Sequence, residues 1–509
     1  MLLLLPLLLA CHRDRPAPTD DVHDSPIDSP DDSPIDSAPL VSVDVLVIGA
    51  GPAGLAAAYE AKEAGASVLV LEMDEKSGGG GWYGAHFFGV NTRWQQDMRI
   101  VDSKELAESE WPAITAGGDP QDPWVQALFT QGDATIGWLT DTFGAVVETV
   151  VFDHTGGSVP RLHLVSIDGQ PPVGGLVQAL EADTWTSCQA TALREEEGRV
   201  RGAWFTDLRT GEESAIEATA TVVATGGFAR DPERLMADRP DLEGARVLFD
   251  IHPQATGAGL PLLEGVNARF TSSGRYGVYV HATADYRPGM EREVLWVGSV
   301  FNTMVIDLNG ARVGNEEDLA DFGFVSHLVA APDKRLFALY PASVYAGVSG
   351  TIPAYNWVDP GTPESLDARE MVELGVVSEL ADAQALAEWL GAEPGPVADS
   401  LARYDALANQ HRDDDFGKAG ELLLPFGAGP IYAVELFPSA AKSFGGVALD
   451  PEARVLGPDG QPIPGLFAAG EVAGMLGTEA VGEGFPGSVT GVYLTGRVAG
   501  QSAAAEALR

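Results

Sequence analysis

The chain has 509 residues, of which 45% are hydrophobic, 21% charged and 8% aromatic. At roughly 150 residues per domain, this length provides two or three domains with large apolar cores, and the composition excludes a disordered, coiled-coil or small disulfide-stapled protein. The formal net charge of −43 would repel phosphate backbones and anionic lipid, so we expect no nucleic-acid partner.

An apolar run opens the chain and ends at Cys11. Because a membrane-spanning helix needs about 20 apolar residues, this shorter run indicates a targeting segment. Leu8-Leu9-Ala10-Cys11 resembles the lipobox of bacterial lipoproteins, whose cysteine becomes the lipidated first residue of the mature chain. We therefore predict export to the cell envelope, on its periplasmic face or at the cell surface, with a lipid on Cys11 as the sole membrane contact. An uncleaved hydrophobic N-terminus is the alternative.

Residues 12–42 are rich in Asp, Ser and Pro and contain few apolar side chains. Such a segment cannot build a core, which predicts a disordered linker between the signal segment, residues 1–11, and a folded body. The second cysteine, Cys188, is predicted to be a buried thiol. Two cysteines are too few for a disulfide framework or a cysteine-based metal site, and we expect no metal.

The body begins with a βαβ pattern. Residues 43–48 are an almost continuous aliphatic run, typical of a buried parallel strand, and residues 49–54 read Gly-Ala-Gly-Pro-Ala-Gly. Residues 55–64 favour a helix, and residues 67–72 form a second strand that ends at an acid. A glycine fingerprint in this order of elements predicts a dinucleotide-binding site.

Each part of the fingerprint has a mechanical reason. Gly49 permits a tight turn, Gly51 lets the backbone approach a pyrophosphate, and Gly54 allows close packing of the helix on the strand. The helix N-terminus then faces the anion, and Glu72 is placed to accept hydrogen bonds from ribose hydroxyls.

Further glycine-rich segments follow later in the chain. Residues 77–81 read Ser-Gly-Gly-Gly-Gly, residues 224–228 read Ala-Thr-Gly-Gly-Phe after a predicted buried strand, and residues 464–471 read Pro-Gly-Leu-Phe-Ala-Ala-Gly-Glu. Two more motifs are Val-Ile-Gly-Ala-Gly-Pro-Ala-Gly at 47–54 and Asp-Asp-Phe-Gly at 414–417. In this combination and order, the motifs resemble those of a large FAD-dependent family. That family includes soluble fumarate reductases, succinate dehydrogenase flavoprotein subunits, urocanate reductases and 3-ketosteroid dehydrogenases.

The resemblance covers most of residues 43–505 and implies an α/β fold. It implies a Rossmann-like FAD-binding domain that is discontinuous, built from residues 43–270 and 441–509, with an α+β capping domain, residues 271–440, inserted between them. It also implies the cofactor-binding residues, which are Gly49, Gly51, Pro52, Ala53, Gly54 and Glu72 for the ADP half, Ser77, Gly78 and Gly79 near the phosphates, and Thr225, Gly226, Gly470, Glu471, Ser488 and Val489 towards the flavin. His86 is offset from the pattern of covalent flavin attachment, so we predict noncovalent FAD.

The sequence departs from the fumarate reductases at the substrate site. Those enzymes carry arginines in the cap and in the final loop, whereas the segments after Asn315-Glu316 and around residues 478–484 have no arginine here. A dicarboxylate needs a cationic clamp, so fumarate and succinate are poor substrate candidates. Phe485 stands where ketosteroid dehydrogenases carry the tyrosine of a Tyr-Pro-Gly motif, and it lacks the hydroxyl that would act on a ketone.

Three residues are the candidates for catalysis. His281 is placed either to transfer a proton or to make a structural hydrogen bond, and Lys442 either donates a proton, binds an anion or is a solvated loop lysine. Arg275 is placed to bind substrate, together with Tyr276 and Tyr279, although this spacing also fits a strand packed on a core.

The predicted function is that of an FAD-dependent oxidoreductase acting on a carbon–carbon bond of a small organic substrate, bound between flavin and cap. Flavin chemistry requires the protein to position the substrate, exclude water and supply a proton. The alternative is a flavin-loaded but catalytically degenerate surface protein that serves binding or electron relay. No nicotinamide domain or haem motif is recognised, so an external electron donor or acceptor is expected.

Overall fold

A computed structural model describes residues 41–115, 117–151, 157–271, 275–284, 294–298, 300–320, 324–351, 365–480 and 485–509. The predicted signal segment and most of the predicted linker, residues 1–40, lie outside the described residues. The chain from residue 41 onwards forms one compact unit. The finer domain boundaries at residues 270 and 440 therefore stay a prediction.

The first sheet joins the two ends of the body. Its order is β19-β20-β9-β1-β2-β6, and β1, β2, β6, β9 and β20 run parallel to one another. A hairpin of β7 and β8 extends from β9 in antiparallel fashion. The strands are β1 Val41–Ile48, β2 Val68–Leu71, β6 Thr184–Trp185, β7 Cys188–Glu196, β8 Arg199–Asp207, β9 Glu213–Val223, β19 Arg454–Leu456 and β20 Pro462–Ala468.

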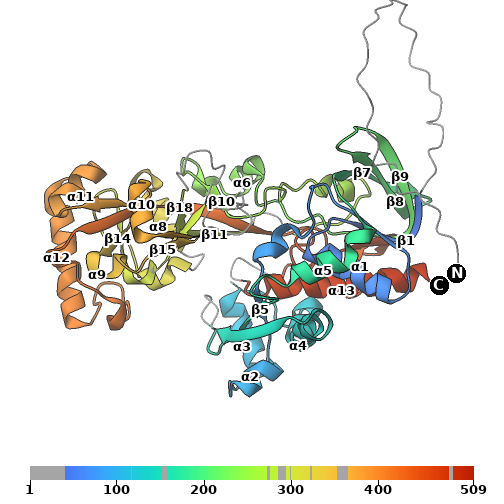
Figure 1. The fold of residues 1–509 in the computed structure, drawn as a ribbon, viewed down its shortest axis with the longest axis horizontal. Coiled ribbons are helices and arrows are strands. Elements are labelled where there is room, and N and C mark those ends of the chain that lie inside the picture. The colour runs from blue at the N-terminus through green and yellow to red at the C-terminus, as the bar shows by residue number, and fades with distance from the viewer. Residues whose placement is uncertain are drawn as a thin grey trace, which may run out of the picture. The chain divides into compact units, whose positions relative to one another are not determined.

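The predicted βαβ unit lies at the centre of this sheet. The side chains from Val45 to Ile48 are buried, as a parallel strand covered on both faces requires, and α1, Pro52–Glu63, connects β1 to β2. The last helix, α13, Ser488–Ala507, packs against α1, as Figure 1 shows for the red and blue helices. The α/β fold, with strands from both ends of the chain in one sheet, is thereby confirmed.

The second sheet is built around β18, Ile431–Phe444. In the sequence, all its strands come after β9 and before β19 of the first sheet. Its order is β13-β14-β18-β11-β12-β15-β16, and β10 and β17 pair with β18 in addition. The other strands are β10 Leu248–Phe249, β11 Arg275–Thr283, β12 Leu295–Val297, β13 Met304–Asp307, β14 Leu336–Pro341, β15 Ser349–Thr351, β16 Ser365–Asp367 and β17 Ser378–Leu380. The helices that follow these strands are α8 Val325–Ala330, α9 Ala342–Tyr345, α10 Ala368–Glu373, α11 Ala383–Leu390 and α12 Pro394–Gln410, and Figure 1 shows α9, α11 and α12 grouped near β14.

A buried ionic cluster fixes part of the second sheet. Arg312 forms a bidentate pair with Glu316, at 2.9 and 2.7 Å, and contacts Asp413 at 2.9 Å. Lys418 Nζ lies 3.2 Å from Glu316 and donates to the Thr303 carbonyl at 2.6 Å. The sequence has no arginine in the segment after Asn315-Glu316. Glu316 instead pairs with Arg312, which precedes it, and is fully buried.

A three-stranded antiparallel sheet, β3-β5-β4, lies beside the N-terminal helices. Its strands are β3 His86–Phe88, β4 Val146–Val151 and β5 Leu162–Ser166, and the helices of the first half are α2 Arg93–Asp97, α3 Lys104–Ile114, α4 Pro123–Phe143, α5 Val173–Leu180, α6 Pro232–Asp238 and α7 Leu260–Glu264. Arg161, directly before β5, has no exposed surface and forms a bidentate pair with the buried Asp102 at 2.9 and 2.8 Å. Its second partner is Glu110 of α3.

We expect Arg161→Met to lower the free energy of unfolding by about 3–5 kcal/mol, because it leaves a buried carboxylate without its cation. Burial alone would raise the pKa of Asp102, but the Arg161 guanidinium and neighbouring hydrogen bonds lower it below its usual value. A lowered folded-state pKa means that this stabilisation is present above the ordinary aspartate pKa and is lost as the pH falls through the folded value. Urea denaturation at neutral and acidic pH measures both effects.

Arg369→Met is the matched control for this experiment, because Arg369 pairs with Glu373 on the surface and is 86% exposed. Exposed pairs of this kind contribute little, so no measurable change is expected. Equal stability of the Arg161 and Arg369 variants would contradict the role assigned to the buried cluster.

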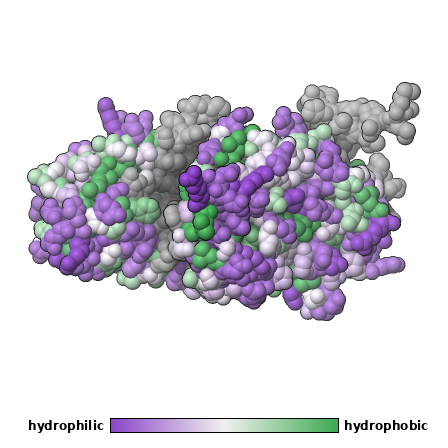
Figure 2. All heavy atoms as spheres, turned by 90° about the horizontal axis from the view of Figure 1, so that it is seen from below, coloured by the Kyte–Doolittle hydropathy of each residue, from purple (hydrophilic) through white to green (hydrophobic). Residues whose placement is uncertain are grey.

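The described surface is hydrophilic over most of the face in Figure 2, with apolar residues in small separate groups. Large exposed apolar side chains include Val101, Trp204 and Leu508, which lie far apart in the sequence. Within the part of the chain that the structure describes, no helix combines the length and the apolar character that crossing a membrane requires.

Candidate functional site

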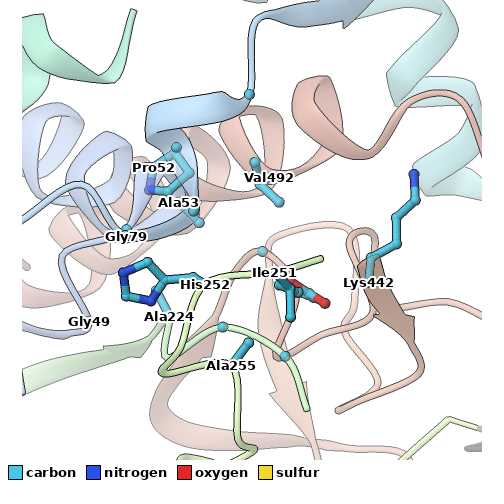
Figure 3. A pocket seen from close by; sticks show the side chains of 18 of the residues that line it. Gly49, Pro52, Ala53, Gly79, Ala224, Ile251, His252, Ala255, Lys442 and Val492 are labelled. Atoms are coloured by element: carbon cyan, nitrogen blue, oxygen red, sulfur yellow. The ribbon is translucent and has the colours of Figure 1, made fainter. Parts of the chain in front are cut away.

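A cavity of about 910 Å³ runs along the carboxyl ends of the parallel strands. Segments from the whole length of the body line it: the turn after β1, the end of β2, the loop after β9, residues 250–262, and the start of α13. This is the edge of a doubly wound sheet at which ligands bind, and the volume lies in the range of small-molecule and cofactor sites. Figure 3 shows Gly49, Pro52 and His252 towards one end of the labelled residues and Lys442 at the other.

The glycine turn is shaped to approach a ligand. Gly51 lines the cavity, and a Cβ atom added there would meet no protein atom within 4 Å. Its side-chain position therefore faces the open cavity, and only a ligand would occupy the space. Gly51 is also the N-cap of α1 and provides no side-chain cap, so backbone N–H groups of the first turn are left for a ligand. These residues fit a bound dinucleotide.

Glu72 follows β2 and is 9% exposed. Its two carboxylate oxygens accept hydrogen bonds from the backbone N–H of Ala50 at 2.7 Å and of Asp74 at 2.8 Å. Burial raises the pKa of Glu72, which these backbone hydrogen bonds partly offset. The carboxylate thus holds the glycine turn in place, and Glu72 also lines the cavity, at the position where a ribose would lie.

Glu471 connects two loops and the end of a strand at the other end of the cavity. Its Oε1 accepts hydrogen bonds from the Ser443 backbone N–H at 2.8 Å and from the Ser443 hydroxyl at 3.0 Å, and the same hydroxyl accepts from the Phe228 N–H at 3.0 Å. Burial raises the pKa of Glu471. The hydrogen bonds fix the loops that follow β9 and β20 against the end of β18.

Lys442 lies in β18 and lines the cavity. Its Nζ lies 3.3 Å from Oγ of Ser488, the first residue of α13. Burial lowers the pKa of Lys442 to about 8, although the negative charge of Glu471 counteracts this shift. The ammonium group and the positive end of α13 therefore meet at one place, where an anionic group would be stabilised.

The structure brings most of the predicted cofactor residues together. Those that line the cavity are Gly49, Gly51, Pro52, Ala53, Glu72, Gly79, Thr225, Gly226, Gly470, Glu471, Ser488 and Val489. Ser77, Gly78 and Gly54 stand behind this lining. The Ser77 carbonyl accepts from the Trp82 indole at 3.0 Å, the Gly78 N–H donates to Ala50 at 2.8 Å, and Gly54 packs against the Gly49 carbonyl.

The sequence analysis did not identify the cavity segment of residues 250–262. Its lining residues are Asp250, Ile251, His252, Gln254, Ala255, Ala258, Gly259 and Leu262. The available signal was Ala-Thr-Gly-Ala-Gly at 255–259, a small-residue stretch followed by α7. Cys188 is buried as predicted, but it also lines the cavity.

Two of the three catalytic candidates have no described side chain. The backbone of Arg275 and His281 belongs to β11, and Arg275 pairs with Phe444 in register, but their side chains lie outside the described residues. Lys442 of β18 pairs in register with Gly277 of β11. Tyr279 lines the cavity, whereas Tyr276 is fully buried and donates to Asp238 at 3.0 Å.

A parallel sheet with a glycine turn, a terminal acid and a long cavity that reaches the N-terminus of α13 defines a dinucleotide-binding protein. The chain matches the model of the FAD binding domain family over residues 44–485 and belongs to that family. The predicted cofactor, FAD, and the prediction of an FAD-dependent oxidoreductase are confirmed.

Relatives of known activity are similar over most of the chain. The NADH:fumarate oxidoreductase of Klebsiella pneumoniae is 29% identical over 479 residues, which cover 92% of this chain and 48% of that protein, so the chain spans about half of its length. The open conformation of a flavocytochrome c3 fumarate reductase aligns with a TM-score of 0.73 and 23% identity, over 92% of this chain and 79% of that chain. The 3-ketosteroid Δ1-dehydrogenase of Sterolibacterium denitrificans aligns with a TM-score of 0.71 and 17% identity, over 91% and 99% of the two chains. At these identities the two solved structures establish the fold alone.

Proposed function

We propose that the chain reduces or dehydrogenates a carbon–carbon bond of a small organic substrate, which binds in the cleft between the flavin and the capping residues 271–440. The observation that carries this proposal is Lys442, a lysine at the cavity wall beside the N-terminus of α13. FAD, when bound, supplies the hydride transfer. The protein has to hold the substrate, exclude water and supply or accept one proton.

Two of these tasks, excluding water and transferring a proton, have described residues. Tyr279, Phe301 and Phe485 line the cavity and provide apolar or aromatic surface that excludes water. Lys442 holds a proton on Nζ, and its pKa of about 8 lets it exchange that proton near neutral pH. Glu471 provides the opposing charge that keeps part of the Lys442 population protonated.

The charges of the cavity disfavour a dicarboxylate. Among the described lining residues, Lys442 is the only lysine or arginine, whereas the acids are Glu72, Asp250 and Glu471. Among these described residues, two substrate carboxylates would meet a single cation in an acidic, partly desolvated cavity, which is costly. We propose a substrate with one anionic group or none.

The experiment is to mix the photoreduced, oxygen-free flavoprotein with separate panels of enones, unsaturated monocarboxylates, steroids and fumarate, and to follow the visible absorbance of the flavin. Rapid reoxidation by a compound of the first three panels supports the proposal. Reoxidation by fumarate alone contradicts the charge argument. If no panel reoxidises the flavin, the result favours the alternative, a flavin-loaded protein that serves binding or electron relay. Whether the enzyme reduces or dehydrogenates its substrate, an external electron donor or acceptor completes the cycle.

We propose noncovalent attachment of FAD. His86 lines the cavity, but the predicted offset from the covalent pattern argues against a bond to its ring. Acid precipitation of the protein should release all flavin into the supernatant, and flavin that remains in the pellet would contradict this proposal.

We further propose export and a lipid anchor at Cys11, on the strength of the Leu-Leu-Ala-Cys sequence. Labelling cells with a radioactive fatty acid tests it. The full-length chain should incorporate label and the Cys11→Ala variant should not, whereas equal labelling of both would exclude Cys11 as the site.

A further inference from the structure

His252 is a cavity residue to which neither the glycine fingerprint nor the proposed reaction gives a role. It lies in the turn after β10, where its carbonyl accepts a hydrogen bond from the Ala255 N–H at 2.9 Å. Its side chain is 20% exposed and lines the cavity. Figure 3 shows the imidazole ring near the labelled Gly49 and Ala224, at the end away from Lys442.

The hydrogen bonds of the turn select one tautomer of His252. The backbone N–H of Gln254 donates to Nδ1 at 3.3 Å, so in the neutral ring the proton sits on Nε2. Nε2 lies 3.8 Å from Oδ2 of Asp74, which is an ion-pair separation and too long for a hydrogen bond. The neutral ring therefore carries its N–H on Nε2. The charged imidazolium form of the ring would be stabilised by Asp74.

A short series of contacts connects His252 to the glycine turn. Asp74 donates its backbone N–H to one oxygen of Glu72, and the other oxygen of Glu72 accepts from Ala50 within the turn. The imidazole thus lies at the same end of the cavity as the N-terminus of α1, where the diphosphate of a dinucleotide binds.

The charged groups around His252 come from every neighbouring segment. Asp74 and Glu72 follow β2, Asp250 belongs to the same turn, and Arg230 follows β9. Burial lowers the pKa of His252, Asp74 raises it, and Arg230 lowers it further, with a net pKa below the ordinary value. In the absence of a ligand the ring is therefore mostly neutral at pH 7. The negative charges of a diphosphate would reverse this balance, because an adjacent anion favours the imidazolium.

We propose that His252 donates its Nε2–H to the diphosphate of FAD and takes up a proton on Nδ1 when FAD binds, giving up the 3.3 Å hydrogen bond from the Gln254 N–H, so that the affinity for FAD increases as the pH falls. This inference rests on the cofactor alone and is independent of the substrate. Above the pKa of His252 in the complex, the affinity is weak and constant. It increases as the pH falls through that pKa, and becomes constant again below the lower pKa of the ligand-free protein.

The test compares the deflavinated full-length chain with its His252→Gln variant. The dissociation constant for FAD is measured from about pH 5.5 to pH 9, and proton uptake is measured by calorimetry in two buffers of different ionisation enthalpy. A charge-assisted hydrogen bond predicts that the wild type binds FAD about tenfold more tightly at the acidic end than at the alkaline end. The variant should show the alkaline affinity throughout and should lose the fraction of a proton that the wild type takes up.

Two further variants separate this role from a structural one. His411→Asn is the control, because His411 caps α12 in the left-handed region, at φ 50°, which asparagine tolerates, and it is not among the residues that line the cavity. It should retain the wild-type pH dependence. Asp74→Asn removes the charge that favours the imidazolium, so it should move the increase in affinity to lower pH.

Equal proton uptake by the wild type and His252→Gln would overturn the inference while leaving the proposed reaction intact. An apoprotein that binds no FAD at any pH would overturn both. A protein that binds FAD with the expected pH dependence but reacts with no substrate panel would support the role of His252 and contradict only the proposed reaction.

Discussion

Replacing Lys442 by methionine is expected to lower the turnover number by about 10²–10⁴-fold, the contribution of a positioned general acid or base, while FAD remains bound. Methionine keeps most of the length and the apolar stem of lysine but carries no proton. Ser443 and Glu471 hold the surrounding loops through their own hydrogen bonds, so the cavity should keep its shape. Steady-state kinetics and the flavin absorbance of the purified variant measure the two effects separately.

The pH profile of the wild type gives the direction of proton transfer. With a pKa of about 8, Lys442 is protonated at pH 7, so as a proton donor in alkene reduction it predicts a kcat/KM that falls as the pH rises through about 8. As a base in dehydrogenation it predicts the opposite slope. Lys104→Met, a change at a surface lysine paired with Glu108, is the control and should retain turnover and profile. An unchanged profile in the Lys442 variant would exclude Lys442 as the proton-transfer group.

Replacing Gly51 by valine is expected to weaken FAD binding by about 100-fold or more and to leave the fold intact. The backbone of Gly51 is extended, with φ −74° and ψ 179°, which any residue adopts, and apart from its own chain neighbours no protein atom lies within 4 Å of the added Cβ. The new side chain therefore enters only the space of the cofactor, where overlap costs about 1–3 kcal/mol or more. The dissociation constant for FAD and the thermal unfolding of the apoprotein together measure this.

Gly54→Ala is the contrasting variant. A Cβ at Gly54 would lie 1.9 Å from the Gly49 carbonyl oxygen and 3.2 Å from Cγ1 of Val47, so it would force α1 away from β1. This variant should lower the unfolding temperature of the apoprotein as well as the affinity for FAD. If the Gly51 variant were equally destabilised, or if it bound FAD normally, the assignment of Gly51 to the cofactor surface would be wrong.

The local elements of the FAD site were predictable because they depend on short-range chemistry. The predicted strand of residues 43–48 lies within β1, and the predicted helix of residues 55–64 overlaps nearly all of α1, Pro52–Glu63. Aliphatic continuity, glycine spacing and the terminal acid at residue 72 are properties of a few neighbouring residues. They identify the turn, its ligand class and the edge of the sheet where the ligand binds.

The sequence by itself determined the βαβ unit and its glycine turn, because both follow from residue types at fixed spacing, and its resemblance to a flavoprotein family gave the cofactor. Only the tertiary structure placed His252 near Asp74, which is 178 positions away, and Lys442 beside Ser488. It also paired Arg161 with Asp102 in the interior. Such contacts arise when distant strands and loops meet at one edge of a sheet, and no local pattern records which loops those will be. The burial that lowers the pKa of Lys442 likewise exists only once the surrounding segments have packed.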